Sequence, residues 1–364
     1  MLTRHGRIKT PVFMPVATQG AIKYLSALEI KKIGFALILS NTYHLMLRPS
    51  VKLIKRLDGL HHFINWDKAI LTDSGGFQIF SLAQNKNKSK DNLVKLTKQG
   101  VQFKSYIDGS QYSLTPVQAL KLQISLGVDI AVCLDECVAL PALKKYLQES
   151  IELTSRWAKI TKQAYDKMPQ PKPLLFAVIQ GGLDKKLRLK SLEDLQALDF
   201  DGYNIGGLSV GEAPRQMYEV LDYLIPQMPT DKPRYLMGVG YPENILEAVK
   251  RGVDMFDCVI PTREGRHGRL FVFKPRAQVL IKKALRSGKI NQGGFYQALN
   301  LSNAKFAKDK NPINSQAKLP ELKQYSRAYL HYLLKVNEPL GQRLATLNNL
   351  EFYYDLMEYI RRGI

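Results

Sequence analysis

Short apolar runs that stop at polar or glycine-rich turns recur along this chain, and amphipathic segments separate them. Such runs predict buried strands, whereas apolar residues at spacings of three and four predict helices. The predicted strands cover residues 36–40, 69–72, 130–134, 174–179, 203–205, 235–237 and 255–257. The clearest predicted helices cover residues 116–126, 147–165 and 243–249. This alternation predicts repeated βα units whose strands run parallel in one sheet.

The spacing of these units favours a closed barrel over an open doubly wound sheet. Seven or eight units in about 250 residues are typical of a (β/α)8 barrel of the TIM type, whereas a doubly wound sheet usually carries a glycine-rich dinucleotide-binding turn after an early strand. The early part of this chain lacks such a turn. We therefore expect an α/β fold in which residues 1–364 form a single catalytic barrel domain.

Polar residues or glycines follow nearly every predicted strand. The set consists of Asn41, Asp73, Asp135, Gln180, Gly207 and Asp257. One aspartate after a strand is explained well enough by the capping of a turn. Because the carboxyl ends of barrel strands meet at one mouth, however, the whole set is expected to converge there, as in the active site of an enzyme.

The charge of the chain adds a preference for polyanions. It carries 53 Lys and Arg against 32 Asp and Glu, a net charge of +21. Such an excess attracts nucleic acid, although a generally lysine-rich surface would give the same total. From Arg263 to Lys310 there are twelve Lys or Arg but only two acids, Glu264 and Asp309. This clustering, soon after Asp257, favours a phosphate-binding segment.

The sequence shows neither an apolar stretch of transmembrane length nor a cleavable signal peptide, so we expect a cytoplasmic protein without a membrane partner. Cys133, Cys137 and Cys258 lack CxxC spacing, which is typical of reduced thiols. A redox pair of Cys133 and Cys137 is the alternative.

Longer motifs extend this pattern over nearly the whole chain. They occupy residues 72–78 (TDSGGFQ), 103–109 (FKSYIDG), 134–137 (LDEC), 180–182 (QGG), 206–212 (GGLSVGE), 235–240 (YLMGVG) and 254–259 (DMFDCV). In order and spacing they closely resemble the tRNA-guanine transglycosylases of the bacterial type, also called queuine tRNA-ribosyltransferases. The resemblance implies a (β/α)8 barrel, in agreement with the pattern of strands and helices.

The resemblance also implies a reaction. Guanine at the wobble position of tRNAs with GUN anticodons, those for Asp, Asn, His and Tyr, would be exchanged for a 7-deazaguanine in queuosine biosynthesis. Asp257 would be the nucleophile that forms a covalent ribosyl-aspartate, by the logic of retaining glycosidases, and Asp73 would be the proton acceptor. Cys137 and Val210 resemble the residues of bacterial enzymes that use 7-aminomethyl-7-deazaguanine, which favours this small base.

The same resemblance assigns binding residues. The base would contact Asp73, Ser74, Gly75, Gly76, Phe77, Asp135, Gln180, Gly207 and Met237. An acid, an amide and a backbone N–H suit the polar edge of a purine, and Phe77 and Met237 would sandwich its ring unless both belong to the ordinary core. The tRNA would contact Gly238, Val239, Gly240, Tyr241, Pro242, Glu243, Asn244, Thr262, Arg263, Glu264, Gly265 and Arg266, with residues 262–266 expected as a loop.

The chain departs from the family at the zinc site. Relatives hold a structural zinc ion with a C-x-C-x-x-C cluster and a later histidine. At these positions the present chain has Ala317, Leu319, Leu322 and Asn348, which lack the thiolates and imidazole that zinc prefers. We therefore expect no metal and no other cofactor, and apolar packing in a subdomain at about 271–347 that replaces the zinc-binding region. Family members commonly pair through this region, so a homodimer with Tyr325, Tyr329 and Tyr332 at the contact is a further expectation.

Residues 272–302 exceed the family pattern by roughly 20 residues, enough for an element of their own. Lys282, Lys283, Arg286 and Lys289 make the segment basic. It either stabilises the subdomain, with a turn at Gly293 and Gly294, or binds tRNA, and the sequence favours neither.

Two other functions stay open. A non-catalytic tRNA-binding paralogue is one, although drift would have spared neither Asp73 nor Asp257. A barrel glycosidase acting on free sugars is the other, but its mouth would be acidic or aromatic, whereas arginines flank this one.

Overall fold

In the computed structural model, which describes residues 1–85, 94–287 and 294–364, strands and helices alternate as predicted. Nine strands form the main sheet in the order β3-β14-β13-β12-β11-β10-β6-β5-β4. Neighbouring strands such as β5 and β6, or β11 and β12, run parallel and are joined through helices. This is the topology of an α/β barrel of the TIM type, and the predicted fold class is confirmed.

Contacts divide the chain into two compact units. The first consists of residues 1–8, 18–20 and 37–237, and the second of residues 9–17, 21–36 and 238–364. The prediction of one catalytic domain with a subdomain at about 271–347 stays a prediction.

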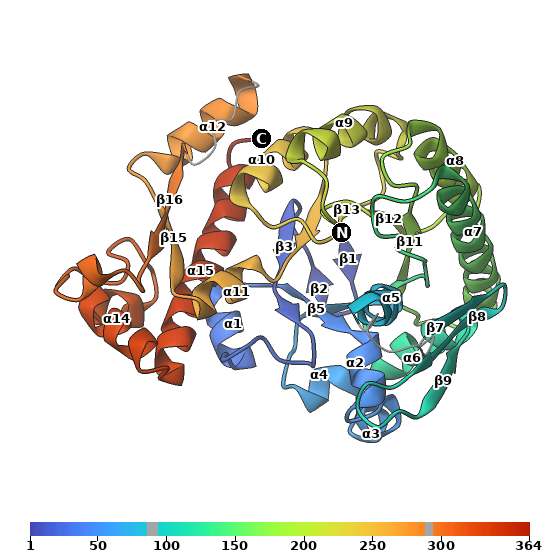
Figure 1. Cartoon of the computed structure of the whole chain (residues 1–364), viewed down its shortest axis with the longest axis horizontal. Helices are drawn as coiled ribbons and strands as arrows, with labels where there is room; N and C mark the ends of the chain where they lie inside the picture. The colour runs from blue at the N-terminus through green and yellow to red at the C-terminus, as the bar shows by residue number, and fades with distance from the viewer. Residues whose placement is uncertain (86–93, 288–293) are drawn as a thin grey trace. The chain divides into compact units, whose positions relative to one another are not determined.

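The first unit contains most of the parallel strands and the helices that follow them. Its strands are β1 (Leu2–Thr3), β2 (Gly6–Arg7), β5 (Leu37–Asn41), β6 (Ala69–Asp73), β7 (Val94–Thr97), β8 (Gly100–Lys104), β9 (Gln111–Leu114), β10 (Ile130–Val132), β11 (Leu174–Ile179), β12 (Gly202–Ile205) and β13 (Arg234–Leu236). Its helices are α2 (Thr42–Leu47), α3 (Val51–Arg56), α4 (Gly59–Phe63), α5 (Gly76–Asn85), α6 (Pro116–Leu126), α7 (Lys144–Asp166), α8 (Lys185–Gln196), α9 (Pro214–Leu224) and the 3-10 helix η1 (Ile225–Gln227). Figure 1 shows α7 and α8 on the outer side of β11 and β12.

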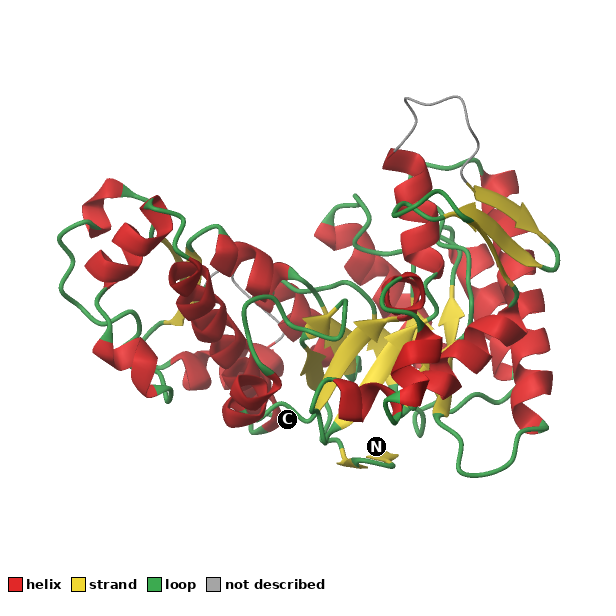
Figure 2. Ribbon diagram, turned by 90° about the horizontal axis from the view of Figure 1, so that it is seen from below, coloured by secondary structure: helices red, strands yellow, loops and turns green. Residues whose placement is uncertain are grey.

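Local sequence explains the elements that carry the site. Helix α6 begins where Thr115 and Gln118 form a capping box with Pro116 in the first turn, and it ends at Gly127, whose φ of 78° suits glycine. Strand β11 is a continuous apolar run and is buried along almost its whole length, as expected of a parallel strand covered on both faces. The separate antiparallel sheet β7-β8-β9 lies apart from the main strands in Figure 2.

The second unit is mostly helical. Its strands are β3 (Val12–Met14), β4 (Val16–Ala17), β14 (Met255–Asp257), β15 (Arg269–Phe273) and β16 (Tyr296–Asn300). Its helices are α1 (Ala27–Ile33), α10 (Pro242–Lys250), α11 (Ile260–Arg266), α12 (Ala277–Ser287), the 3-10 helix η2 (Ala304–Phe306), α13 (Pro320–Gln324), α14 (Arg327–Lys335) and α15 (Pro339–Arg361). Helix α15 is buried along most of its 23 residues and contacts α11, α12, α14 and β15, so it is the core of this unit.

The basic segment of the sequence forms an element of its own, as predicted. Strands β15 and β16 pair antiparallel, and the ladder closes at Phe273 opposite Tyr296. Residues 274–295 therefore lie between two paired strands, and they include helix α12, which Figure 1 shows beyond the end of the ladder. The predicted cation Lys289 and the predicted turn residue Gly293 lie outside the described residues.

Candidate active site

The first unit brings several of the predicted residues to the carboxyl ends of neighbouring strands. Asn41 at the end of β5 lies directly opposite Asp73 at the end of β6. Ile179 on β11 pairs with Ile205 on β12, so Gln180 and Gly206 leave their strands side by side. Members of the expected set are thus found at the ends of two pairs of neighbouring strands, while convergence with Asp257, which lies in the second unit, stays a prediction.

Asp73 is held by three hydrogen bonds to its carboxylate. Asn41 Nδ2 donates to its Oδ2 at 2.5 Å and Gln78 Nε2 to the same oxygen at 3.2 Å, while the Gly75 N–H donates to Oδ1 at 3.1 Å. Gly75 has a φ of 83°, and a side chain there would collide with Tyr43. The glycine-rich turn therefore folds its backbone back onto the carboxylate and fixes the direction of Asp73.

Asp135 is buried and faces Gln180. The Gln180 amide donates from Nε2 to Asp135 Oδ2 at 2.8 Å. Burial raises the pKa of Asp135 to about 6, and the hydrogen bond from Gln180 offsets part of this rise. Gly76 allows the turn around Ser74 to lie close to the backbone of Asp135, because a Cβ at Gly76 would be only 2.6 Å from the Asp135 carbonyl oxygen. The raised pKa thus belongs to a carboxyl group that is held in a buried hydrogen bond with the Gln180 amide.

Two glycines make room for Gln180. A Cβ at Gly206 would lie 2.7 Å from Gln180 Nε2, and one at Gly207 would lie 2.5 Å from Gln180 Oε1. Gly207 also has a φ of 61°, a conformation that favours glycine. The Gly206–Gly207 turn therefore packs its backbone against the Gln180 amide.

Arg188 on α8 supports this turn and was not predicted from the sequence. Its side chain is fully buried, and its guanidinium donates to the carbonyl oxygens of Ile179 at 3.1 Å, Gly182 at 2.8 Å and Gly207 at 3.2 Å. Burial lowers the pKa of Arg188 to about 10. One cation thus joins the ends of β11 and β12. The only signal in the sequence was its place in the helix after the QGG motif.

Phe77 and Met237, the proposed sandwich for the base, differ in exposure. Phe77 is 50% exposed, which excludes the alternative that it is an ordinary core residue. Met237 is half-buried, and its N–H donates to the Ile205 carbonyl oxygen at 3.3 Å. The sandwich itself stays a prediction.

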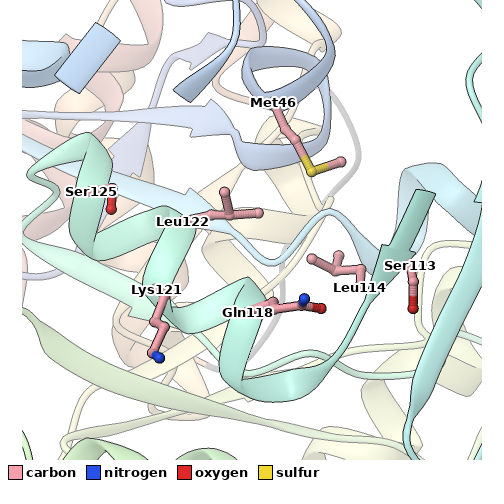
Figure 3. A pocket seen from close by; sticks show the side chains of 7 residues that line it. All are labelled: Met46, Ser113, Leu114, Gln118, Lys121, Leu122 and Ser125. Carbon is pink, nitrogen blue, oxygen red and sulfur yellow. The ribbon is translucent and has the colours of Figure 1, made fainter. Parts of the chain in front are cut away.

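The first unit contains two cavities that are lined by other residues. One, of about 500 Å³, is lined by residues that include Phe80, Glu136, Cys137 and Tyr146, next to Asp135 in sequence. The other, of about 270 Å³, lies between α2, α6 and the end of β9 and is lined by residues such as Met46, Leu114 and Leu122 (Figure 3). None of the predicted base-binding residues lines either cavity, so the site is defined by its polar side chains.

In the second unit, Asp257 ends strand β14. Its Oδ1 accepts a hydrogen bond of 2.8 Å from the Gly238 N–H. Gly240 has no space for a side chain because Cys258 packs against it, and the Gly240 carbonyl oxygen accepts a hydrogen bond from the buried hydroxyl of Tyr353 on α15. The loop of residues 238–241 is therefore fixed both to Asp257 and to the central helix of the unit.

The prediction that residues 262–266 form a loop is wrong. They belong to helix α11, which has Pro261 in its first turn, a position that proline favours. Gly265 lets α11 approach α15 closely, because a Cβ there would lie 3.0 Å from the Thr346 backbone nitrogen. Thr262 is buried and Arg263 is exposed, so the helix presents only part of the segment to a partner.

Two acidic side chains of the second unit, Glu264 and Glu243, contact cations or hydrogen-bond donors of the same unit. Glu264 lies 3.7 Å from Arg263 and 3.5 Å from Arg269, and Glu243 at the start of α10 accepts a hydrogen bond of 2.7 Å from the Tyr296 hydroxyl. These contacts hold the two carboxylates close to cations or donors within the unit.

Comparison with known proteins decides the family. Residues 1–364 match the family described as queuine tRNA-ribosyltransferase. The chain belongs to this family. The queuine tRNA-ribosyltransferase of Desulforamulus reducens is 46% identical over 364 residues, which cover 100% of this chain and 90% of that protein. That of Caldanaerobacter subterraneus subsp. tengcongensis is 47% identical over 362 residues, covering 100% and 88%. The resemblance seen in the motifs is thereby confirmed.

The four residues predicted to stand at the zinc-ligand positions of relatives carry side chains that do not suit a zinc ion. Ala317, Leu319 and Leu322 are 3%, 5% and 0% exposed and bring no donor side chain. Asn348 is fully buried, and its amide is used within the protein: Oδ1 accepts from Asn314 Nδ2 at 3.0 Å and Nδ2 donates to the Phe271 carbonyl oxygen at 3.0 Å. At these four positions the structure has apolar packing and an amide network, and the absence of a zinc ion stays a prediction.

One cluster of potential metal ligands does occur among the described residues. The donor atoms of His5, His61 and Asp129 lie within 4.8 Å of one another. His5 Nδ1 lies 2.8 Å from Asp129 Oδ1, and His61 Nε2 lies 3.1 Å from Oδ2. The two rings are stacked with centroids 3.8 Å apart. Because a metal binds in the plane of an imidazole, stacked rings cannot both ligate one ion without turning, and the geometry suits a hydrogen-bonded carboxylate better.

The three thiols are free, in agreement with the sequence. Burial raises the pKa of Cys137 to about 12 and that of Cys258 to about 11, so neither is a ready nucleophile at neutral pH. Among the described helices, none combines the length and the apolar character that crossing a membrane requires.

Proposed function

We propose that this chain is a tRNA-guanine transglycosylase that exchanges guanine at the wobble position of GUN-anticodon tRNAs for a 7-deazaguanine in queuosine biosynthesis. The observation that carries the proposal is the buried contact between Asp135 and Gln180 beside Gly207. A carboxylate, a side-chain amide and a backbone amide are the groups needed to read the polar edge of a guanine. Membership of the queuine tRNA-ribosyltransferase family supports the class of reaction.

Recognition of the base follows from the charge of Asp135. The ring N–H and the exocyclic amine of guanine are both donors, so an ionised carboxylate accepts from them and a protonated one accepts less well. Gln180 orients this carboxylate through its Nε2. A 7-deazaguanine keeps the same edge and differs on the opposite side of the ring, so one site serves the leaving and the entering base. We expect 7-aminomethyl-7-deazaguanine as the entering base.

Asp257 is the nucleophile in this proposal. Its carboxylate attacks C1′ of the wobble ribose, the bond from C1′ to N9 breaks, and the electron pair stays on the guanine, which takes up a proton. The product is a ribosyl ester of Asp257 in an uncut RNA strand, analogous to the intermediate of retaining glycosidases. The Gly238 N–H fixes one oxygen of the nucleophile by a hydrogen bond of 2.8 Å.

Asp73 handles the proton. It accepts the N9 proton of the entering base, whose nitrogen then displaces Asp257 from C1′, and by microscopic reversibility it supplies the proton to the leaving guanine. Asn41, Gln78 and the Gly75 N–H hold its carboxylate in place. That Asp73 and Asp257 act on the same nucleotide is part of the proposal and rests on the family resemblance.

The partners belong to the proposal as well. The wobble base must leave its stack to reach the enzyme, so the substrate is the unpaired anticodon loop of the tRNAs for Asp, Asn, His and Tyr. We expect the reaction to take place in the cytoplasm. A homodimer through the exposed rings of Tyr325, Tyr329 and Tyr332 is also part of the proposal. No step requires a metal or an organic cofactor.

Exchange of labelled guanine into an unmodified GUN-anticodon tRNA tests the function. We expect incorporation by the protein, none by Asp257→Ala or the isosteric Asp257→Asn, and normal incorporation by Glu149→Gln, which removes an exposed carboxylate on α7. A protein–RNA adduct that survives denaturation and is missing from both Asp257 variants would support the ester. Tight tRNA binding without incorporation would instead favour a non-catalytic paralogue.

A further inference from the structure

Helix α12 belongs to a stretch of the chain without acidic residues. From Gly265 to Lys308 there is no Asp or Glu, but there are ten Lys or Arg. Helix α12 itself contributes Lys282, Lys283 and Arg286, all of which are exposed. No ion pair is found for these three among the described residues. The helix therefore presents a cationic face that the protein does not neutralise internally.

The opposite face of α12 anchors the helix in the second unit. Ala277 and Ile281, one turn apart, are 4% and 0% exposed. The helix contacts α15 and α10, and Leu285 lies so close to Gly363 that a Cβ there would be 2.8 Å from its Cδ1. The cations are thus carried on a packed helix, which fixes their positions relative to one another.

The elements next to α12 are those that hold the nucleophile. Helix α10 follows the loop whose Gly238 N–H donates to Asp257, and Tyr296 at the end of the β15–β16 ladder donates to Glu243 on α10. The cationic face and Asp257 therefore belong to one compact unit. A molecule bound covalently at Asp257 that is large and carries many phosphates is able to reach such a face.

We propose that Lys282, Lys283 and Arg286 on α12 bind the phosphate backbone of the tRNA outside the exchanged nucleotide. This inference rests on the proposed function and adds a second contact surface to it. Contacts to phosphates do not depend on the base sequence, so the face serves every tRNA that the active site accepts. Because this face contributes to the affinity for tRNA, the residues that contact the base can serve to discriminate between bases.

Two other occupants fit the observations less well. A second copy of the chain in a twofold contact would place cations opposite cations, which is repulsive. An anionic membrane suits a basic amphipathic helix with exposed apolar residues such as Val279, which is 63% exposed. The substrate proposed above, however, is itself a polyanion, so RNA is the partner that the charge favours.

The salt dependence of tRNA binding tests the proposal. The triple variant Lys282→Gln, Lys283→Gln, Arg286→Gln is compared with the wild-type protein in filter binding to an unmodified tyrosine tRNA transcript between 50 and 300 mM salt. Each lost phosphate contact lowers the slope of log affinity against log salt by about 0.7 to 0.9. We expect a reduction of about 2 and a Kd that is roughly ten- to a hundredfold weaker at physiological salt. In the exchange assay the loss should fall on KM for tRNA rather than on kcat.

A matched control removes the same charge elsewhere. Lys52, Lys55 and Arg56 are exposed on the short helix α3 of the first unit, and their triple Gln variant should keep the wild-type slope. Equal losses in both variants would overturn the proposal, because they would reflect net charge alone. An α12 variant that binds tRNA with wild-type affinity would also overturn the proposal. So would unchanged tRNA binding together with a change in oligomeric state or in binding to vesicles of anionic lipid. Binding is measured without chemistry, so failure of the exchange reaction would be seen separately.

Discussion

The buried carboxyl group of Asp135 predicts a pH dependence. Burial raises its pKa to about 6 from a usual value of 3.8. Between these values the folded chain holds a proton that the unfolded chain has lost, so the free energy of unfolding falls as the pH rises through this range. A shift of about two units corresponds to about 3 kcal/mol. In urea unfolding from pH 4 to 7, Asp135→Asn should lack this decrease, and in the parent protein KM for guanine should rise below about pH 6.

The exposed carboxylate Asp166 on α7 provides the control for this experiment. It forms a salt bridge with Lys162 at the surface, and Asp166→Asn should keep the pH profile of the parent protein. A profile of Asp135→Asn that is identical to the parent would show that the decrease comes from other groups.

Some residues of the candidate site could be predicted from the sequence and others could not. The places of Asp73, Asp135 and Gln180 at or just after the ends of buried strands could be predicted, because a polar residue is conspicuous after an apolar run, whereas their roles stay predictions. Arg188 could not be predicted, because arginine on an amphipathic helix is ordinarily a surface residue and is rarely buried without a carboxylate partner. Its role depends on three carbonyl oxygens that only the folded loops bring together.

At the scale of elements, Asn349 on α15 joins a helix to a strand. Its Nδ2 donates to the carbonyl oxygens of Pro261 at 3.0 Å and Arg269 at 2.9 Å, and its Oδ1 accepts from the Phe271 N–H at 2.9 Å. Asn349→Ala would leave these buried groups unpaired and should lower the free energy of unfolding by about 3 kcal/mol. Urea unfolding measures this loss. Gln148→Ala, which removes an exposed amide on α7, should change stability little, and equal stability of both variants would contradict the prediction.

Long elements were predicted more accurately than short ones. Helix α6 and strand β11 have the predicted bounds because their apolar period is regular and their ends are marked by Thr115, Gly127 and polar turns. Strands β3 and β4 contain only three and two residues, too few for a period to be recognised. Residues 262–266 were expected as a loop, but they form part of helix α11, which has Pro261 in its first turn and packs closely against α15 at Gly265.

For the whole molecule, the replaced zinc site predicts independence from metal. Leu319, Leu322 and Asn348 are among the residues predicted at the positions of zinc ligands, and none of their side chains suits zinc, so dialysis against a strong chelator should change neither the thermal midpoint nor the rate of guanine exchange. Elemental analysis before and after dialysis is the accompanying measurement. One equivalent of zinc, lost together with stability, would contradict the prediction, and His61→Ala would then show whether the cluster with Asp129 had held the ion.

The sequence predicts that the zinc ligands are missing, since the family's site uses cysteines and a histidine and the corresponding positions have neither; this stays a prediction. It did not reveal what takes their place. Asn314 and Asn348 are far apart along the chain, and only folding brings the two amides to 3.0 Å. Long-range polar pairs of this kind leave no periodic signal in a sequence.

The β15–β16 ladder has a consequence for how this protein can change. The five residue pairs between Arg269–Phe273 and Tyr296–Asn300 fix the register of the two strands. The register therefore does not depend on the sequence or the length of residues 274–295, which connect the strands. The Lys274 N–H donates to the Phe295 carbonyl oxygen at 3.0 Å, so a deletion between these residues would leave the two strand ends adjacent. It would, however, expose the apolar surface that Ala277 and Ile281 of α12 cover. A fluorescent reporter domain could be inserted at the same position for use in living cells, because the strand ends at Phe273 and Tyr296 lie side by side.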